Sequence, residues 1–386
     1  MAKVKLGDIC EIVSGSTPKT SIDEYWDGDI DWITPAEISE DTYIVEESVR
    51  KLTQLGVEKT GLKPFPKGTV ILSSRAPIGK VAIAGKEMYC NQGFKNLICS
   101  DKVLPEYLYW FLRGNTAYLN SLGRGATFKE ISKGIVAEIE INLPDKKEQQ
   151  LSVDTLKKVW DVIVVRRQEL EQLDLLIKAR FVEMFGSIYD NKFGYNVRTL
   201  QDVCEPIKDG THQTPTYIDD SINGFKFLSS KDVTTGKIDW NHLKYIQEEL
   251  HNKLYKRISP RKGDILLAKN GTTGVAAIVD KDEVFDIYVS LALIRPLDIV
   301  VSEYLCSAIN STETKKQFDG SLKGIGVPNL HLGEIKKTQI IVPPIELQNQ
   351  FAARLPTLRI RSSLFHKESS TKSWKSSVLI KLIRLS

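Results

Sequence analysis

Short apolar runs separated by glycine-containing turns fill two long stretches of the chain, residues 1–144 and 191–344. In the first stretch, Val-Ile-Leu at 70–72 and Val-Ala-Ile at 81–83 enclose a loop that contains Gly79; in the second, Ile-Leu-Leu at 265–267 and Ala-Ala-Ile at 276–278 enclose a loop that contains Gly274. Each set predicts a strand, a glycine loop and a second strand. We therefore expect two tandem mixed-sheet domains of the α/β (α+β) class.

A helical period follows each stretch. Over residues 145–190, apolar residues recur in steps of three and four, which places them on one face of a helix. About 40 residues at about 1.5 Å each would extend about 60 Å, and Gly186 is a suitable stop. Residues 345–386 carry a weaker stripe of the same kind. The two stripes include Leu156, Trp160, Leu170, Leu173, Ile177, Phe181 and Met184 in the first helix, and Leu347, Phe351, Leu358, Leu364, Val378 and Leu382 in the second.

A helix of this length needs a partner. Because the first helix leads from the first domain to the second, and the second helix starts again from the second domain, we expect an antiparallel coiled coil that sets the distance between the domains. Pro356 costs about 3 kcal/mol inside a helix, and the segment 369–377 is rich in serine, so we expect the second helix to be kinked or broken. The alternative is two ordinary core helices.

The two stretches also repeat one another in sequence. Four segments that begin at Gly15, Trp32, Lys67 and Gly123 are followed, in the same order, by similar segments that begin at Gly210, Phe227, Lys262 and Gly320, and the first three offsets are 195 residues. A chance recurrence would explain one such pair, but four ordered pairs at nearly one offset indicate a duplication.

Composition is that of an ordinary soluble protein, because apolar residues make up 41% and charged residues 26% of the 386 residues. No apolar run approaches the roughly 18 residues of a membrane span, so we expect a cytoplasmic protein. The five scattered cysteines suggest neither a disulfide framework nor a zinc site, and we expect no metal. The net charge of +4 permits nucleic-acid binding through local patches without indicating it.

Several of these segments together resemble one known family. They are Gly15-Ser-Thr-Pro18, the Lys-Gly-x-Ile/Val-Leu strands, Pro343-Pro-Ile-Glu-Leu-Gln348 and, most specifically, Leu173-Asp-Leu-Leu-Ile-Lys-Ala-Arg-Phe-Val-Glu-Met-Phe-Gly186. Over essentially the whole chain, the sequence is similar to the DNA-specificity subunit of type I restriction-modification systems. The resemblance implies that residues 1–144 and 191–344 are target-recognition domains and that 145–190 and 345–386 are spacer helices.

The resemblance also implies partners and cofactors. It implies a non-catalytic subunit that binds double-stranded DNA and docks two adenine-methylating modification (methyltransferase) subunits and two restriction (translocase/endonuclease) subunits. S-adenosylmethionine, ATP and Mg would be bound by those partners and not by this chain. The residues expected to serve helix pairing and subunit docking are Leu170, Leu173, Ile177, Phe181, Met184, Leu347, Phe351 and Leu358.

Two similar but unequal domains on one chain predict a DNA target with two different half-sites and an unread gap. Candidate contacts are polar and basic residues in the glycine-rich loops, since such side chains bind phosphates and base edges. In the first domain they are Ser16, Thr17, Lys19, Thr20, Arg75, Arg124, Lys129 and Lys133. In the second they are Thr211, His212, Gln213, Thr214, Lys269, Asn270, Lys323, Asn329 and His331, with a possible phosphate track at Lys253, Lys256, Arg257, Arg261 and Lys262.

Two other functions stay open at the level of sequence. One is an enzyme that modifies or cuts DNA itself; against it, the chain has no Asn-Pro dipeptide for an amino-methylation motif and no Walker A motif. The other is a coiled-coil scaffold whose globular halves bind protein, which predicts no sequence preference on duplex DNA.

Overall fold

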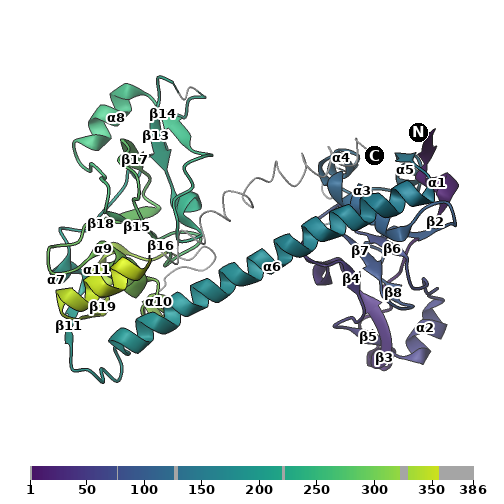
Figure 1. Ribbon diagram of the computed structural model, residues 1–386, viewed down its shortest axis with the longest axis horizontal. Coiled ribbons are helices and arrows are strands. Elements are labelled where there is room, and N and C mark those ends of the chain that lie inside the picture. The colour runs from purple at the N-terminus through teal and green to yellow at the C-terminus, as the bar shows by residue number, and fades with distance from the viewer. Residues whose placement is uncertain (1, 76, 126–128, 220–221, 322–328, 356–386) are drawn as a thin grey trace. The chain divides into compact units, whose positions relative to one another are not determined.

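The computed structural model describes residues 2–75, 77–125, 129–219, 222–321 and 329–355 (Figure 1). The chain divides into two compact units, and the boundary falls between Glu169 and Leu170. The boundary lies inside the helix α6 (Lys146–Phe185), so each unit consists of one mixed α/β domain and one part of this helix.

Unit 1 contains a five-stranded sheet in the order β2-β9-β6-β7-β4, a three-stranded sheet in the order β5-β3-β8 and the pair β1-β10. The elements are β1 (Ala2–Lys5), α1 (Leu6–Ile9), β2 (Cys10–Val13), η1 (Asp23–Tyr25), β3 (Trp26–Ile33), η2 (Pro35–Glu37), β4 (Ile44–Val45), β5 (Lys51–Leu52), α2 (Gln54–Thr60), β6 (Val70–Leu72), β7 (Val81–Ala84), β8 (Tyr89–Cys90), β9 (Asn96–Cys99), α3 (Pro105–Gly114), α4 (Thr116–Ser121), α5 (Lys133–Ala137) and β10 (Glu140–Leu143).

Unit 2 contains a four-stranded sheet in the order β12-β18-β15-β16, a three-stranded sheet in the order β14-β13-β17 and the pair β11-β19. The elements are β11 (Asn196–Thr199), α7 (Leu200–Val203), β12 (Lys208–Asp209), β13 (Phe225–Leu228), η3 (Ser230–Val233), β14 (Lys244–Ile246), α8 (Glu248–Tyr255), β15 (Ile265–Ala268), β16 (Ala276–Ile278), β17 (Phe285–Ile287), β18 (Leu291–Ile294), α9 (Ser302–Ile309), α10 (Thr312–Ser321), α11 (Leu332–Lys337) and β19 (Gln339–Val342).

The two units repeat one strand arrangement. In unit 1, β6 and β7 pair with Val70 opposite Ile83; in unit 2, β15 and β16 pair in the same register, with Ile265 opposite Ile278. The pairs β3–β8 and β13–β17 are both parallel. The duplication and the strand, glycine loop, strand pattern predicted from the sequence are therefore confirmed, and Gly79 and Gly274 have φ of 93° and 81°, a left-handed conformation that favours glycine.

A buried amide side chain is repeated in the same way. Gln149 accepts a hydrogen bond from the Leu104 N–H at 2.8 Å and donates to the Lys102 carbonyl at 3.0 Å. Gln348 accepts from the Val301 N–H at 2.9 Å and donates to the Ile299 carbonyl at 3.1 Å. Each glutamine ties the start of a helix to a loop of its own domain.

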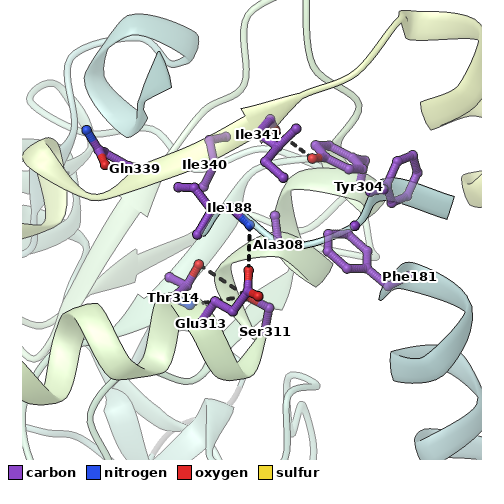
Figure 2. Close-up of a pocket in the computed structure, with 12 residues that line it drawn as sticks. Phe181, Ile188, Tyr304, Ala308, Ser311, Glu313, Thr314, Gln339, Ile340 and Ile341 are labelled. Atoms are coloured by element: carbon purple, nitrogen blue, oxygen red, sulfur yellow. Dashed lines mark hydrogen bonds between the residues drawn. The ribbon is translucent and has the colours of Figure 1, made fainter. Parts of the chain in front are cut away.

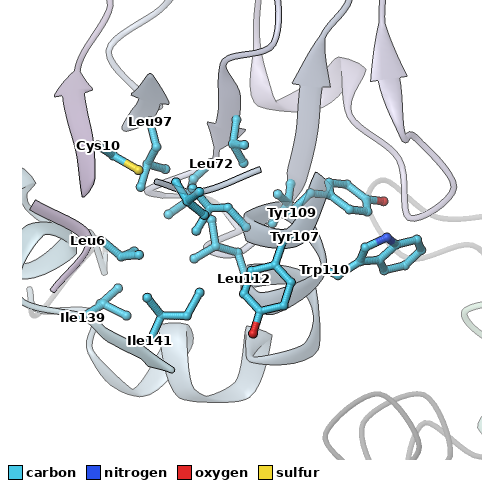
Figure 3. Close-up of a cluster of buried hydrophobic side chains, with 14 of the residues drawn as sticks. Leu6, Cys10, Leu72, Leu97, Tyr107, Tyr109, Trp110, Leu112, Ile139 and Ile141 are labelled. Atoms are coloured by element: carbon cyan, nitrogen blue, oxygen red, sulfur yellow. The ribbon is translucent and has the colours of Figure 1, made fainter. Parts of the chain in front are cut away.

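The core of unit 1 forms where α3 packs on the sheet. Tyr107, Trp110 and Leu112 from the helix belong to one buried cluster with Leu72 of β6 and Leu97 of β9 (Figure 3). All five side chains are buried, and full burial of each leucine contributes about 1.5–3 kcal/mol to folding. In unit 2, α9 takes the place of α3, and Tyr304 donates a hydrogen bond to the Ile341 carbonyl at 2.6 Å.

Helix α6 spans 40 residues and confirms the first long helix. The Asp145 carboxylate accepts the N–H groups of Lys147 and Glu148, both at 2.9 Å, which caps the first turn. At the other end, Gly186 has φ of 72° and its N–H donates to the Val182 carbonyl at 2.8 Å. The helix therefore ends at the predicted glycine, because a left-handed residue closes the last turn.

The apolar stripe of α6 packs on the domains. Val153, Leu156 and Trp160 are buried in the core of unit 1. Phe181 and Phe185 belong to the core of unit 2, where their rings lie 5.6 and 5.5 Å from that of Phe351, measured between centroids. Ile177, Met184 and Leu347 pack against the same core, and Leu170 and Leu173 are half-buried.

The second long helix is described only at its start. Residues 345–355 are helical, with Phe351 and Leu355 buried. Pro356 and Leu358 lie outside the described residues, and so does any pairing of helices beyond this point. The predicted coiled coil stays a prediction.

Within the part of the chain that the structure describes, no helix has the length and apolar character needed to cross a membrane. All five cysteines are free, and four of them are buried, as expected for small core residues.

Candidate nucleic-acid interface

The first glycine loop leaves β2 at a point where two backbones touch. A β-carbon on Gly15 would lie 1.9 Å from the Cys90 carbonyl oxygen, so no other residue fits without a shift. The next residue, Ser16, donates its N–H to that same oxygen at 3.0 Å. The loop therefore starts from a fixed backbone position beside β8.

Two tryptophans fasten the rest of this loop. The Trp32 indole N–H donates to the Ser16 carbonyl at 3.0 Å, and that of Trp26 donates to the Lys19 carbonyl at 3.3 Å. The Arg50 guanidinium lies over the Trp26 ring at 3.7 Å from its centroid, within range of a cation–π contact. With the backbone held, the side chains of Ser16, Lys19 and Thr20 are exposed.

The second glycine loop begins in the same way. A β-carbon on Gly210 would lie 2.0 Å from the Ile287 carbonyl oxygen, and the Thr211 N–H donates to that oxygen at 3.1 Å. The fastening groups differ, however: Arg257 donates to the carbonyls of Asp209 and Gly210. His212, Gln213 and Thr214 are exposed, and Thr211 is half-buried.

A second segment lies beside each glycine loop. In unit 1, Arg124 and Glu130 exchange backbone hydrogen bonds of 3.0 and 2.9 Å. The backbone of Glu130 also forms an isolated antiparallel β-bridge with that of Arg75. In unit 2, the backbones of Asn329 and Asn270 form an antiparallel β-bridge at the equivalent place. These contacts bring the predicted residues Arg75 and Arg124 together beyond the end of β6, and Asn270 and Asn329 together beyond the end of β15.

The two segments of unit 1 are linked through a short run of residues after β8. The Thr17 hydroxyl donates to the Gln92 side chain, and Gly93 accepts the Ser74 N–H at 2.8 Å directly before Arg75. Lys129 and Lys133 are exposed nearby in sequence, Lys133 as the first residue of α5. In unit 2, His331 is exposed at the N-cap of α11.

Lys269, one of the predicted DNA contacts, does not lie on the surface. Lys269 is buried, and its ammonium lies 2.6 Å from the Asp209 carboxylate. Burial opposes ionisation of Asp209, but the hydrogen bond and charge of Lys269, with a smaller contribution from His212, outweigh it and hold the pKa of Asp209 below its usual value. Lys323 lies outside the described residues.

The basic run of unit 2 is exposed but not uniform. Lys253, Lys256 and Lys262 are exposed. Arg261 lies 3.8 Å from Glu205, and Arg257 is used to hold the glycine loop.

The sequence did not single out the anchoring residues Trp26, Trp32 and Arg50. Trp32 stands in a repeated segment, but its role depends on a hydrogen bond to a loop 16 residues away. The ion pair between buried Lys95 and partly exposed Glu130, 3.1 Å apart, was also missed because the two residues are 35 positions apart in the chain.

A small pocket lies apart from these loops. It is lined by Phe181, Tyr304 and Ile341 on one side and by Ser311, Glu313 and Thr314 on the other (Figure 2). The Glu313 carboxylate accepts the Ile188 N–H at 3.0 Å, so it ties the segment after α6 to α10. This arrangement is structural. Among the residues that the structure describes, no group of three or more histidine, cysteine or acidic side chains could hold a metal ion.

The chain matches known proteins over nearly its whole length. The family model described as type I restriction modification DNA specificity domain matches residues 1–175 and again 193–370. The type I restriction enzyme MjaIX specificity subunit of Methanocaldococcus jannaschii is 31% identical over 366 residues, which cover 90% of this chain and 84% of that protein. The EcoBI specificity subunit of Escherichia coli is 23% identical over 67% of this chain and 59% of that protein.

Solved structures show the same fold. The S subunit of a type I restriction-modification system from M. genitalium superposes with a TM-score of 0.56 at 14% identity and covers 99% of this chain and 95% of that one. The family model matches twice, once in each repeat found in the structure. The chain therefore belongs to the DNA-specificity subunits of type I restriction-modification systems, the non-catalytic DNA-recognition components of these complexes.

Proposed function

We propose that each unit reads one half of an asymmetric, two-part duplex DNA target through its glycine loop and the segment beside it. The observation that carries this proposal is that one scaffold occurs twice with the same fixed loop start but different exposed side chains. The exposed loop side chains are Ser16, Lys19 and Thr20 in unit 1, and His212, Gln213 and Thr214 in unit 2. Two unlike sets of hydrogen-bonding groups favour two unlike half-sites.

Within this proposal, the exposed basic residues bind phosphates and the exposed polar residues bind base edges. The phosphate contacts are Lys19, Arg124, Lys129 and Lys133 in unit 1 and the run from Lys253 to Lys262 in unit 2. The base contacts come from the remaining loop residues that are exposed or half-buried: Ser16, Thr17, Thr20, Arg75, Thr211, His212, Gln213, Thr214, Asn270, Asn329 and His331. Lys269 is left out because it is buried.

We further propose that two modification subunits and two restriction subunits assemble on this chain, with S-adenosylmethionine, ATP and Mg held by those partners. The docking surface for the modification subunits is the outer face of α6. Leu151, Val162 and Val165, all in unit 1, are more than half exposed. Residues 11 apart on a helix differ by about 20° in direction and residues three apart by about 60°, so these three side chains form one apolar stripe, opposite Val153, Leu156 and Trp160, which are buried in the core of unit 1.

This stripe replaces part of the docking surface expected from the sequence. Phe181 and Phe351 are buried or half-buried in the core of unit 2, so they are not free to bind another subunit. An exposed apolar stripe on a soluble protein favours a protein partner.

The proposed target is tested by sequencing the host genome and determining the motif in which adenines are methylated. With this chain present, we expect one motif made of two different short halves and an unread gap, and we expect loss of methylation at that motif when the chain is deleted. A palindromic motif, or methylation unaffected by the deletion, would contradict the proposal.

The affinity of the complex of this chain with its modification subunits for duplex DNA distinguishes the proposed function from the two alternatives, an enzyme and a coiled-coil scaffold. We expect a preference for the motif and a steep loss of affinity as salt rises, since phosphate contacts release counterions. A coiled-coil scaffold would show no preference. A chain that cleaves or methylates DNA on its own, in a metal-dependent or S-adenosylmethionine-dependent assay, would overturn the non-catalytic role.

A further inference from the structure

Each unit buries one lysine ammonium at the same place in the fold, but the two lysines come from different strands. Ser74 and Lys269 are equivalent residues after β6 and β15, since Ser74 donates its N–H to the Gly93 carbonyl at 2.8 Å and Lys269 donates to the Ser290 carbonyl at 2.9 Å. In unit 1 the ammonium of Lys95, just before β9, lies 3.5 Å from the Ser74 hydroxyl. Lys95 is 8% exposed and Lys269 is 6% exposed.

The partner of each ammonium lies in a different loop. Lys95 lies 3.1 Å from the Glu130 carboxylate. Glu130 exchanges backbone hydrogen bonds with Arg124, and its neighbour Ile131 donates to the Ser74 carbonyl at 3.0 Å. The ion pair therefore holds the second segment of unit 1, which carries the exposed Arg124 and Lys129.

In unit 2 the pair holds the glycine loop. Lys269 lies 2.6 Å from one oxygen of Asp209, whose other oxygen lies 3.5 Å from His212. Arg257 donates to the Asp209 and Gly210 carbonyls. These contacts converge on the start of the loop that carries His212, Gln213 and Thr214.

Neither unit could make the pair of the other. Where unit 2 has Asp209, unit 1 has Ser14, 195 positions earlier. Where unit 1 has Glu130, unit 2 has Asn329, because Ile131 and Leu330 donate equivalent hydrogen bonds to Ser74 and Lys269. In each unit the acid and the lysine are thus matched, and a buried ammonium without its acid would be strongly unfavourable.

We propose that Lys95 and Lys269 are positioning residues that hold a different DNA-reading element in each unit: Lys95 holds the segment that ends at Glu130, and Lys269 holds the loop that starts at Asp209. The two readers are then repeats in fold but not in the element on which their specificity depends. This inference rests on the proposed function, and it concerns which loop needs its ion pair.

The experiment compares Lys95→Met and Lys269→Met in the full chain, expressed with its modification subunits, and sequences methylated adenines in the cell. For Lys269→Met we expect at least a tenfold loss of methylation at the wild-type motif and relaxed bases in one half-site only. For Lys95→Met we expect the same loss with relaxed bases in the other half-site only. Lys95→Arg and Lys269→Arg, which keep the charge, should restore part of the activity and the wild-type motif.

Several results would overturn the inference. They are methylation unchanged in either Met variant, relaxed bases in both half-sites of one variant, or a uniform loss that the arginine variants do not reverse. If a Met variant does not fold by thermal melting, Glu130→Gln and Asp209→Asn take its place with the same expected half-site pattern. A wild-type motif without two unlike halves would instead refute the proposed function, so the two failures are distinguishable.

Discussion

Gly15 and Gly210 have the most restricted positions among the loop residues. Neither has a left-handed backbone, and glycine is needed because a carbonyl oxygen of the neighbouring strand occupies the place of a β-carbon. In the sequence, both residues stand at the start of a repeated segment, which does not explain why glycine is needed there. The close approach depends on the carbonyls of Cys90 at the end of β8 and Ile287 at the end of β17, which are far along the chain, so a local pattern does not reveal it.

Gly15→Ala and Gly210→Ala should each lower the free energy of unfolding by about 1–3 kcal/mol, the usual cost of overpacking. Gly333→Ala is the matched control, because Gly333 lies in α11 and a β-carbon there meets nothing within 4 Å. It should leave stability unchanged or raise it slightly. Chemical denaturation of the three variants measures the difference, and equal stabilities would rule out the steric account.

Buried carboxylates predict loss of stability in acid. Burial opposes ionisation of Asp31, but hydrogen bonds from Lys86, Ser48 and Lys51 outweigh it, so the pKa of this carboxyl is lowered, as is that of Asp209. An acid whose pKa is lower in the folded state stabilises the fold above its ordinary pKa of about 4, and this contribution is lost as pH falls through the folded pKa.

In thermal melts, the stabilisation by Asp31 and Asp209 should therefore be constant near neutral pH, and the melting temperature should fall below about pH 4 as this stabilisation is lost. Asp31→Asn should be less stable than the wild type at neutral pH and should lose less stability on acidification. A decline of the same size in the variant and the wild type would show that Asp31 does not contribute.

At the scale of elements, α6 was the most predictable part of the chain. Its stripe of apolar residues and its final glycine are local signals, and the helix begins and ends within a few residues of the predicted bounds. The use of the stripe was not predictable. Phe181 and Met184 look the same in sequence whether they meet a helix or a domain core, and the structure places them against the core of unit 2.

The outer face of α6 gives a prediction at the same scale. Val162→Lys with Val165→Lys should reduce co-purification of the modification subunit by at least tenfold, because two charges would be buried at the proposed docking surface. Both residues are more than half exposed, so the melting temperature of the chain should change little.

Leu175→Lys is the matched control for this test. Leu175 is 58% exposed, but ten residues after Val165 its side chain points about 80° away from that of Val165 on a helix. The Leu175→Lys variant should co-purify with the modification subunit as the wild type does. Equal loss in both variants would indicate a general effect on α6, and no loss in the double variant would remove this face as a docking surface.

At the scale of the whole molecule, the repeat carried most of the prediction. An offset of 195 residues in three of four segments was enough to anticipate two domains built on one repeated pattern, and the shared register of β6–β7 and β15–β16 confirms the repeat. The site was less predictable. Lys269 looked like a loop cation, but Asp209, 60 residues earlier, pairs with it in the interior. Burial of that kind is set by tertiary packing, which a single sequence does not specify.

The central claim is that the two halves read DNA separately. The most direct measurement exchanges residues 1–144 for the first domain of another specificity subunit and sequences methylated adenines in cells that express the hybrid with its modification subunits. The account predicts a motif in which one half-site is new and the other half-site is unchanged. A hybrid that folds and methylates a motif altered in both halves, or altered in neither, would contradict it.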